Sequence, residues 1–422
     1  MFKFIHAADI HLDSPLHKLD AYETAPVDMI RQASRKAFEN LVTLAIDQQV
    51  AFVLISGDLY DGDWKDYNTG LYFISQMRRL RDAEIPVFII AGNHDAASKI
   101  TRSLKLPKGV TFLASNTPET TTLPDLKVAI HGQSFASPAI TTDLSATYPA
   151  PLAGFYNIGM LHTCVTGREG HAPYAPCSLE NLASHGYDYW ALGHVHTFER
   201  LKENPAIVFP GNLQGRHIRE SGAKGCLLVS VAENGNTKIE FKPVDVVRWF
   251  ILPVDASGAS DGYDMIDRFA SGLENLISEN PGRPLVVRAV FSGETMAHND
   301  FASGTERWQN EIRAAAADIS NDTVWIEKIK INTHMPGKPS FHSGTDGPLR
   351  TLSEIIEELR RDPESLCTLA DAELSALDMK LPPELKHGDD GLDIKDPEWL
   401  SMILDQVYPV LTQRLMNKGS DG

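Results

Sequence analysis

Five short groups of polar residues carry the side chains that could do chemistry. They are Asp9-Ile10-His11, Gly57-Asp58, Gly92-Asn93-His94-Asp95, Leu161-His162 and Gly193-His194-Val195-His196. Their carboxylate, amide and imidazole groups are ligands that divalent transition metals accept. Asp58 has two carboxylate oxygens and can bridge two ions. The set is therefore large enough for a two-metal centre.

These groups come at the ends of short apolar runs that have the composition of buried strands. The ranges 51–56, 86–91 and 156–161 lead directly into Asp58, Asn93 and His162. In open α/β sheets the carboxyl ends of the strands converge on the ligand crevice. We therefore expect these residues, although far apart in the chain, to meet in one place.

The chemistry of such a centre is phosphoester hydrolysis. Two metals about 3.5–4 Å apart can activate water, neutralise a phosphoryl group and steady the attacking and leaving oxygens. His94 follows the ligand candidate Asn93 and precedes Asp95. This placement suits a histidine that contacts the phosphate and protonates the leaving alkoxide, with Asp95 fixing its orientation and raising its pKa. His94 and Asp95 are thus the predicted catalytic residues.

A glycine-rich segment, residues 210–217, follows another apolar run and could let the backbone approach a phosphate. Arg216 could pair with that phosphate, which makes Arg216 and the adjacent His217 the candidate substrate contacts. The alternative is an ordinary turn with a solvated arginine and a surface or structural histidine. Asp13 and Asp61 are either partners that orient the ligand histidines or simple turn aspartates.

Composition narrows the class of protein. The 422 residues predict two or three domains, and no apolar run approaches the roughly 20 residues of a membrane span, so no membrane association is expected. The start lacks a secretory signal pattern, and the four cysteines form no CxxC pair, which favours the cytoplasm. The net charge of −17 weakens a nucleic-acid interpretation and suggests that a partner holds much of the DNA.

The order of predicted elements gives the domain organisation. Residues 1–247 alternate strands with amphipathic helices, as a layered α/β catalytic domain does, and residues 248–335 repeat strand and helix in a smaller α/β cap. Residues 336–350 are rich in Pro and Gly and predict a linker. Residues 351–422 are predicted helical, beginning at a capping box of Thr351 and Glu354. The apolar stripe from Leu400 to Leu415 would be core or a partner-binding face.

The five polar groups, in this order, resemble the motif blocks of the calcineurin-like metallophosphoesterase superfamily. Within it, the stretches 8–13 and 57–61 and the predicted cap are most similar to the SbcD-type DNA repair exonucleases, in particular the YhaO-like branch. The last eighty or so residues lie outside the resemblance. One departure is Asp61, because some relatives have a histidine three residues after the bridging aspartate.

The resemblance implies a four-layer α/β/β/α sandwich with two divalent ions, commonly manganese. Asp9, His11, Asp58 and His196 would hold the first ion, and Asp58, Asn93, His162 and His194 the second. His94 would be the acid that contacts the phosphate. A nuclease of this type works on DNA with an SbcC-like coiled-coil ATPase. The oligomeric state is open, with a homodimer as one option.

Three functions agree with these observations. The first is a manganese-dependent DNA repair exonuclease. The second is a phosphatase or phosphodiesterase for a small or lipid-linked phosphoester, which the acidic charge favours. The third is a scaffold that retains its metals and holds an ATPase partner.

Overall fold

The structure is a computed structural model that describes residues 1–14, 27–61, 67–97, 106–165, 175–336 and 348–378, with scattered positions between 380 and 411. The chain divides into two compact units. The first comprises Met1–Leu252, Leu276–Arg288 and Ser320–Lys328, and the second Pro253–Asn275, Ala289–Ile319 and Ile329–Gly422. The domain limits expected at 247, 335 and 350 stay predictions.

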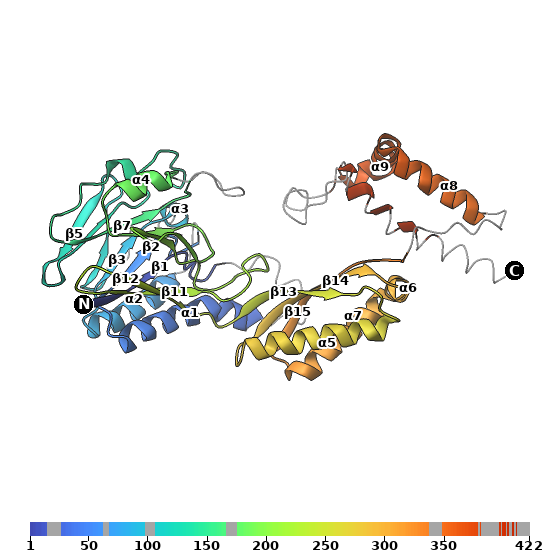
Figure 1. The fold of residues 1–422 in the computed structure, drawn as a ribbon, viewed down its shortest axis with the longest axis horizontal. Helices are drawn as coiled ribbons and strands as arrows, with labels where there is room; N and C mark the ends of the chain where they lie inside the picture. The colour runs from blue at the N-terminus through green and yellow to red at the C-terminus, as the bar shows by residue number, and fades with distance from the viewer. Residues whose placement is uncertain are drawn as a thin grey trace. The chain divides into compact units, whose positions relative to one another are not determined.

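Two six-stranded sheets form the centre of the first unit (Figure 1). One has the order β12-β11-β1-β2-β3-β4, from β1 (Phe2–Ala7), β2 (Phe52–Ser56), β3 (Val87–Ile90), β4 (Val110–Phe112), β11 (Gly225–Val231) and β12 (Thr237–Pro243). The other has the order β5-β6-β7-β8-β10-β9, from β5 (Glu119–Leu123), β6 (Val128–Gly132), β7 (Tyr156–His162), β8 (Tyr189–Gly193), β9 (Glu199–Lys202) and β10 (Ala206–Phe209). Strands β1, β2 and β3 are parallel, and so are β7 and β8.

Helices cover the outer faces of both sheets. Apolar residues recur every three or four positions in α1 (Val27–Asp47) and α2 (Tyr67–Asp82), so that one stripe of each packs on β1, β2 and β3. The short α4 (Leu179–Ser184) packs Leu182 against Trp190 on the other sheet. Phe4, Phe52 and Tyr189 fill the space between the sheets. The expected four-layer sandwich is confirmed.

Shorter elements join the sheets. They are α3 (Asn93–Ala97) and two 3₁₀ turns, η2 (Pro124–Leu126) and η3 (Ser145–Thr147). Helix α3 follows β3 after two residues, so it begins at the carboxyl edge of the first sheet.

Two buried polar side chains tie the sheets together. His6 on β1 is fully buried, with Nδ1 3.0 Å from Tyr189 Oη and Nε2 3.0 Å from the carbonyl oxygen of Leu192. A carbonyl only accepts, so Nε2 carries the proton and Nδ1 accepts from Tyr189. Ser56 Oγ donates to the carbonyl oxygen of Ala191 at 2.9 Å. The ends of β1 and β2 are thus held on β8.

The predicted cap has the expected order of strands and helices. It contains β13 (Arg248–Asp255), α5 (Gly262–Glu279), β14 (Leu285–Glu294), α7 (Thr305–Ser320) and β15 (Val324–His334), with a short helix, α6 (His298–Ser303), that the sequence pattern did not predict. The three strands form one sheet in the order β13-β14-β15. Phe269 on α5 packs against Phe291 on β14, with ring centroids 6.2 Å apart.

The described residues of the C-terminal part are helical, as predicted, but the helical region begins earlier. Helix α8 (Pro348–Arg361) starts at Pro348, and α9 (Pro363–Asp378) follows. Proline is favoured at the first helical position because it lacks only an amide hydrogen that would be unpaired there. Thr351 therefore lies inside α8, and the predicted capping box is wrong. The rest of the predicted linker lies largely outside the described residues.

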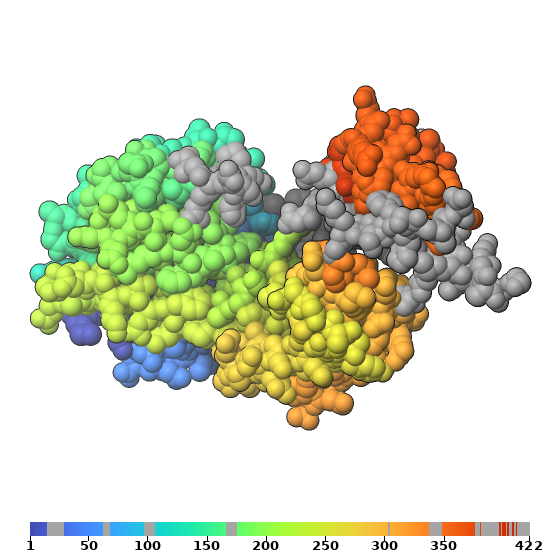
Figure 2. Space-filling view, turned by 45° about the vertical axis from the view of Figure 1, so that its right-hand side comes forward, coloured from blue at the N-terminus to red at the C-terminus, as the bar shows by residue number. Residues whose placement is uncertain are grey.

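Helices α8 and α9 form a compact cluster (Figure 2). Leu400 and Leu404 are buried in it against Ile356, Leu366 and Ala370. This part of the C-terminal apolar stripe is therefore core of the chain, while Leu415 lies outside the described residues. Within the described ranges, no helix is both long and apolar enough to cross a membrane.

Replacing His6 with Gln should reduce the amount of stability that the folded protein loses when the pH is lowered. Burial lowers the pKa of His6 from 6.5 to about 3, so the folded protein keeps this ring neutral while the unfolded chain takes up a proton. Its contribution is complete above the unfolded pKa and falls by about 1.4 kcal/mol per pH unit as the pH drops toward the folded pKa.

Melting temperatures of metal-free protein at about pH 7 and about pH 5 check this expectation. The drop between the two should be smaller for His6→Gln than for the wild type or for His334→Gln, whose side chain is 63% exposed. Equal drops in all three proteins would contradict it.

Candidate metal centre

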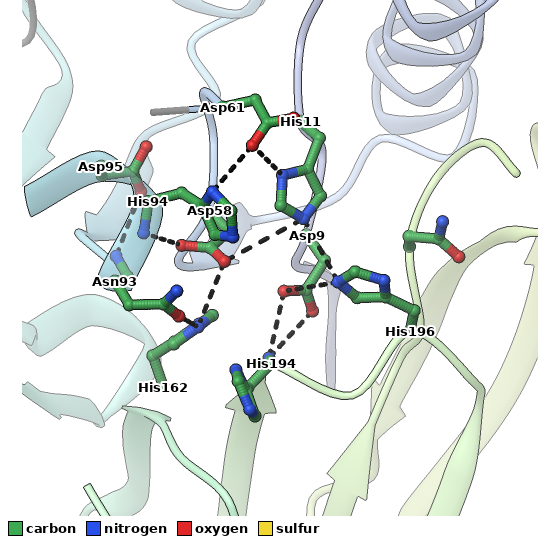
Figure 3. Close-up of polar contacts among 12 residues, drawn as sticks. Asp9, His11, Asp58, Asp61, Asn93, His94, Asp95, His162, His194 and His196 are labelled. Atoms are coloured by element: carbon green, nitrogen blue, oxygen red, sulfur yellow. Dashed lines mark hydrogen bonds and ion pairs between the residues drawn. The ribbon is translucent and has the colours of Figure 1, made fainter. Parts of the chain in front are cut away.

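The polar groups predicted from the sequence meet at the carboxyl ends of strands from both sheets (Figure 3). Asp9 and His11 follow β1, Asp58 follows β2, Asn93 begins α3, His162 ends β7, and His194 and His196 follow β8. Their potential ligand atoms form three overlapping groups, each within 4.8 Å: Asp9, His11 and His196; His11, Asp58 and His94; Asp9, Asp58 and His162.

The loops that carry these residues turn sharply. Asp9, His11 and Asp58 have φ angles of 50°, 44° and 50°, in the left-handed region that residues other than glycine rarely adopt. Each such residue costs on the order of 1 kcal/mol. The amides of Asp9 and His11 donate to the carbonyl oxygens of Gly57 and Asp58, both at 3.0 Å, so the two loops hold each other in this conformation.

Gly193 allows the two sheets to approach each other here. A Cβ atom at this position would lie 2.0 Å from the carbonyl oxygen of Ser56. Any larger residue would push β8 away from β2. The glycine thus lets the loop after β8 bring the amide of His194 and the ring of His196 close to Asp9.

Asp58 uses its two oxygens differently. Oδ1 accepts the amide hydrogen of His94 at 2.9 Å. Oδ2 lies 4.0 Å from His11 Nε2 and 3.4 Å from His162 Nε2. Burial raises the pKa of Asp58, but the neighbouring His162 outweighs it and holds the pKa well below its usual range. One ionised oxygen therefore faces imidazoles from both sheets.

His162 and His196 are held so that Nε2 faces the centre. His162 Nδ1 lies 3.0 Å from the carbonyl oxygen of Ser56, and His196 Nδ1 lies 2.7 Å from Glu220 Oε1. Both oxygens only accept, so both Nδ1 atoms carry the proton. His196 Nε2 lies 3.2 Å from His11 Nε2 and 3.8 Å from Asp9 Oδ1. His162 Nε2 lies 3.0 Å from Asn93 Oδ1.

Convergent nitrogens and oxygens of this kind repel one another unless a cation or a proton lies between them. Although burial opposes it, Asp58 raises the pKa of His162 to about 9, so a positive charge is favoured at this point. Imidazole, carboxylate and amide donors suit divalent transition metals. The residues present therefore fit metal ions on both sides of Asp58.

His194 contributes its backbone to the centre. Its amide donates to both oxygens of Asp9, at 3.1 and 2.9 Å. Its ring packs edge to face against His162, with centroids 5.3 Å apart, and points away from Asp9 in Figure 3. The three convergent groups of described residues do not include it. Its role as a ligand stays a prediction.

His94 lies beside the centre and is held by Asp61. Its Nδ1 lies 2.7 Å from Asp61 Oδ1, and its side chain is 41% exposed. The hydrogen bond to Asp61 raises the pKa of His94 in spite of partial burial. His94 therefore lies beside the centre, where its protonated form is favoured more than in an ordinary histidine.

Asp95 does not orient His94, contrary to the expectation from the sequence. Its carboxylate accepts the amide hydrogens of Leu59, Tyr60 and Gly92, at 3.0, 2.8 and 3.1 Å. As the third residue of α3 it reaches back to the loop after β2. Asp95 thus fixes that loop, and Asp61 takes the orienting position.

The remaining candidates lie at the edge of the centre. The side chain of Arg216 is 17% exposed and lies 2.9 Å from Glu220, so it is not a solvated arginine. His217 is 53% exposed, with Nε2 3.6 Å from Glu220 Oε1. Asp13 pairs with Arg35 at 2.7 Å. Whether Arg216 and His217 bind substrate stays a prediction.

Glu220 is the site residue that the sequence analysis missed. Its side chain is 5% exposed, and it is the partner of His196. The only signal was an acidic residue four positions after Arg216 in a glycine-rich segment, which alone does not distinguish an orienting carboxylate from an exposed one.

Two family models match the chain. The model of calcineurin-like phosphoesterases matches residues 2–198, which include all predicted ligands. The model of the middle domain of metallophosphoesterase YhaO matches residues 249–334, which is most of the predicted cap.

Known proteins share long segments with the chain. The uncharacterized metallophosphoesterase YhaO of Bacillus subtilis (strain 168) is 34% identical over 294 residues, which are 69% of this chain and 71% of that protein. The DNA double-strand break repair protein Mre11 of Saccharolobus solfataricus is 27% identical over 251 residues, 56% of this chain and 61% of that protein. A solved structure of a dimetal phosphatase from Danio rerio covers 57% of this chain and 99% of its own, at 12% identity and a TM-score of 0.36. The chain therefore belongs to the calcineurin-like metallophosphoesterases, hydrolases that act on phosphoester bonds.

Proposed function

We propose that this phosphoesterase is a manganese-dependent DNA repair exonuclease that works with an SbcC-like coiled-coil ATPase. The observation that carries the proposal is the similarity to Mre11, a DNA double-strand break repair protein, over 56% of this chain. The match spans 61% of that protein, so substrate and partner are proposed rather than transferred. The net charge of −17 supports the need for a partner that binds the DNA backbone.

The candidate ligands form two sets that share Asp58. Asp9, His11, Asp58 and His196 would hold one ion, and Asp58, Asn93, His162 and His194 the other. When bound, two such ions activate water and neutralise charge on the phosphoryl group. His94 has Nδ1 engaged with Asp61, which leaves Nε2 to donate a proton to the leaving oxygen. The amide of His94 meanwhile donates to Oδ1 of Asp58 and fixes the carboxylate that would contribute to both ions.

Asp58→Asn should abolish manganese-dependent digestion of linear and hairpin DNA. An amide oxygen is neutral, so both ions would lose an anionic ligand together. The loss should exceed the roughly 100-fold effect that removing an outer partner of a metal ligand can have. Gel assays with manganese, with a small chromogenic phosphodiester run in parallel, measure it.

Asp125→Asn serves as the matched control, because Asp125 is exposed on η2, and it should cut like the wild type. If the wild type turns over only the small ester, even with the ATPase partner added, the nuclease proposal fails and a small-molecule phosphodiesterase takes its place.

His94→Gln should affect substrates unequally. A deoxyribose alkoxide is a poor leaving group and needs a proton, whereas nitrophenolate leaves without one. We expect kcat on DNA to fall by about 10²–10⁴-fold and kcat on a nitrophenyl phosphodiester to fall much less. Single-turnover rates on both substrates test this. Equal losses would mean that His94 acts as a ligand or a phosphate contact and not as an acid.

A further inference from the structure

We propose that Arg216 is a positioning residue, held between Glu220 and Asp61, which fixes the imidazoles of the metal centre instead of binding substrate. The inference rests on the proposed two-metal site but not on DNA as its substrate. It assigns one role to Arg216, Glu220 and Asp61. The sequence predicted Arg216 as a substrate contact and did not predict Glu220 as a site residue.

On one side, Arg216 is bound to the carboxylate that holds His196. Arg216 Nη2 lies 2.9 Å from Glu220 Oε1, and Nε lies 3.3 Å from Glu220 Oε2. The same Oε1 accepts from His196 Nδ1 at 2.7 Å. A two-point contact fixes the plane of a carboxylate as well as its position. The guanidinium therefore sets the direction from which Glu220 holds the imidazole.

On the other side, Arg216 faces the carboxylate that holds His94. Arg216 Nη1 lies 3.5 Å from Asp61 Oδ2. The other oxygen, Oδ1, lies 2.7 Å from His94 Nδ1 and 3.7 Å from His11 Nδ1. Asp61 thus has one oxygen toward the imidazoles and one toward Arg216. It stands at the position where some relatives have a histidine.

The backbone around Arg216 is fixed as well. The amide of Arg216 and Asn212 Nδ2 both donate to Glu220 Oε2, at 2.8 and 2.9 Å. Lys224 Nζ donates to the carbonyl oxygen of His196 at 2.7 Å. The carbonyl oxygen of Gly215 accepts from Trp249 Nε1 at 3.0 Å. The segment is therefore not free to swing Arg216 toward a substrate.

These contacts make Arg216 unavailable for binding a phosphate. Its side chain is 17% exposed, against 5% for Glu220 and 19% for Asp61. A phosphate that recruited the guanidinium would leave the buried carboxylate of Glu220 and the partly buried one of Asp61 without their cation, which is strongly unfavourable for Glu220. The two carboxylates and one guanidinium also leave a net negative charge beside the ions.

The direction in which metal affinity changes when Arg216 is replaced distinguishes a positioning residue from a substrate contact. Arg216 is a cation next to a cation site, so removing its charge should strengthen metal binding if charge alone matters. If Arg216 positions the ligands, removing it should weaken metal binding. A substrate contact predicts a higher KM and metal affinity that is unchanged or increased.

The test is a titration of the full chain with Mn²⁺ in the absence of substrate, with free Mn²⁺ followed by its EPR signal. Arg216→Met removes the charge, Arg216→Lys keeps the charge but loses the two-point contact, and Glu220→Gln keeps an acceptor for His196. Arg219→Met removes an exposed arginine from the same segment and is the control. Melting temperatures of the metal-free variants check that each is folded.

We expect Arg216→Met and Glu220→Gln each to weaken Mn²⁺ binding by about 10–100-fold, with Arg216→Lys intermediate and Arg219→Met at least as tight as the wild type. The double variant Arg216→Met/Glu220→Gln should lose less Mn²⁺ affinity than the sum of the two single losses in free energy, because both residues act through His196. If Arg216→Met binds Mn²⁺ as tightly as the wild type or more tightly, the positioning role is overturned. A wild type that binds fewer than two ions would instead count against the proposed two-metal site, whatever the variants do.

Discussion

The structure of this site depends on one carboxylate oxygen. Asp58 Oδ2 lies between His11 and His162, which come from different sheets, while Oδ1 is held by the amide of His94. Because β2 lies between β1 and β3 in its sheet, its carboxyl end is the point that loops from both neighbours can reach. A group that is to be shared by two cations has to be central, buried and ionised, and the fold gives Asp58 all three properties.

The other features of the fold keep that oxygen in place. Left-handed backbone at Asp9, His11 and Asp58 turns the loops inward, and paired amides and carbonyls hold them. Gly193 permits contact between the sheets, and His6 and Ser56 secure it with hydrogen bonds. An outer set of carboxylates, Asp61 and Glu220, then orients the imidazoles. Strain in the loops is thus balanced by hydrogen bonding between elements that are distant in the chain.

Much of this was predictable because strand ends are visible in the sequence. Apolar runs that end just before Asp58, Asn93 and His162 indicate both the sheets and the candidate ligands, and the ordered motifs indicate the family. Contacts made by loops were less predictable, although Asp61 was one candidate for orienting the histidines. Asp95 adjoins His94 in the chain, yet a turn of α3 directs it to the amide of Tyr60, and Asp61 reaches His94 from another loop. The local sequence does not identify Glu220 as an orienting carboxylate, because its role exists only once His196 is placed beside it. The start of α8 was misplaced because Pro348 competes with the capping pattern at Thr351.

The most direct measurement of the central claim is the EPR spectrum of the protein loaded with two equivalents of Mn²⁺. If one oxygen of Asp58 is shared, the ions are close enough to couple, and the spectrum should be that of an exchange-coupled pair in the wild type and of isolated ions in Asp58→Asn. A six-line spectrum of isolated Mn²⁺ in the wild type, with both equivalents bound, would contradict the account.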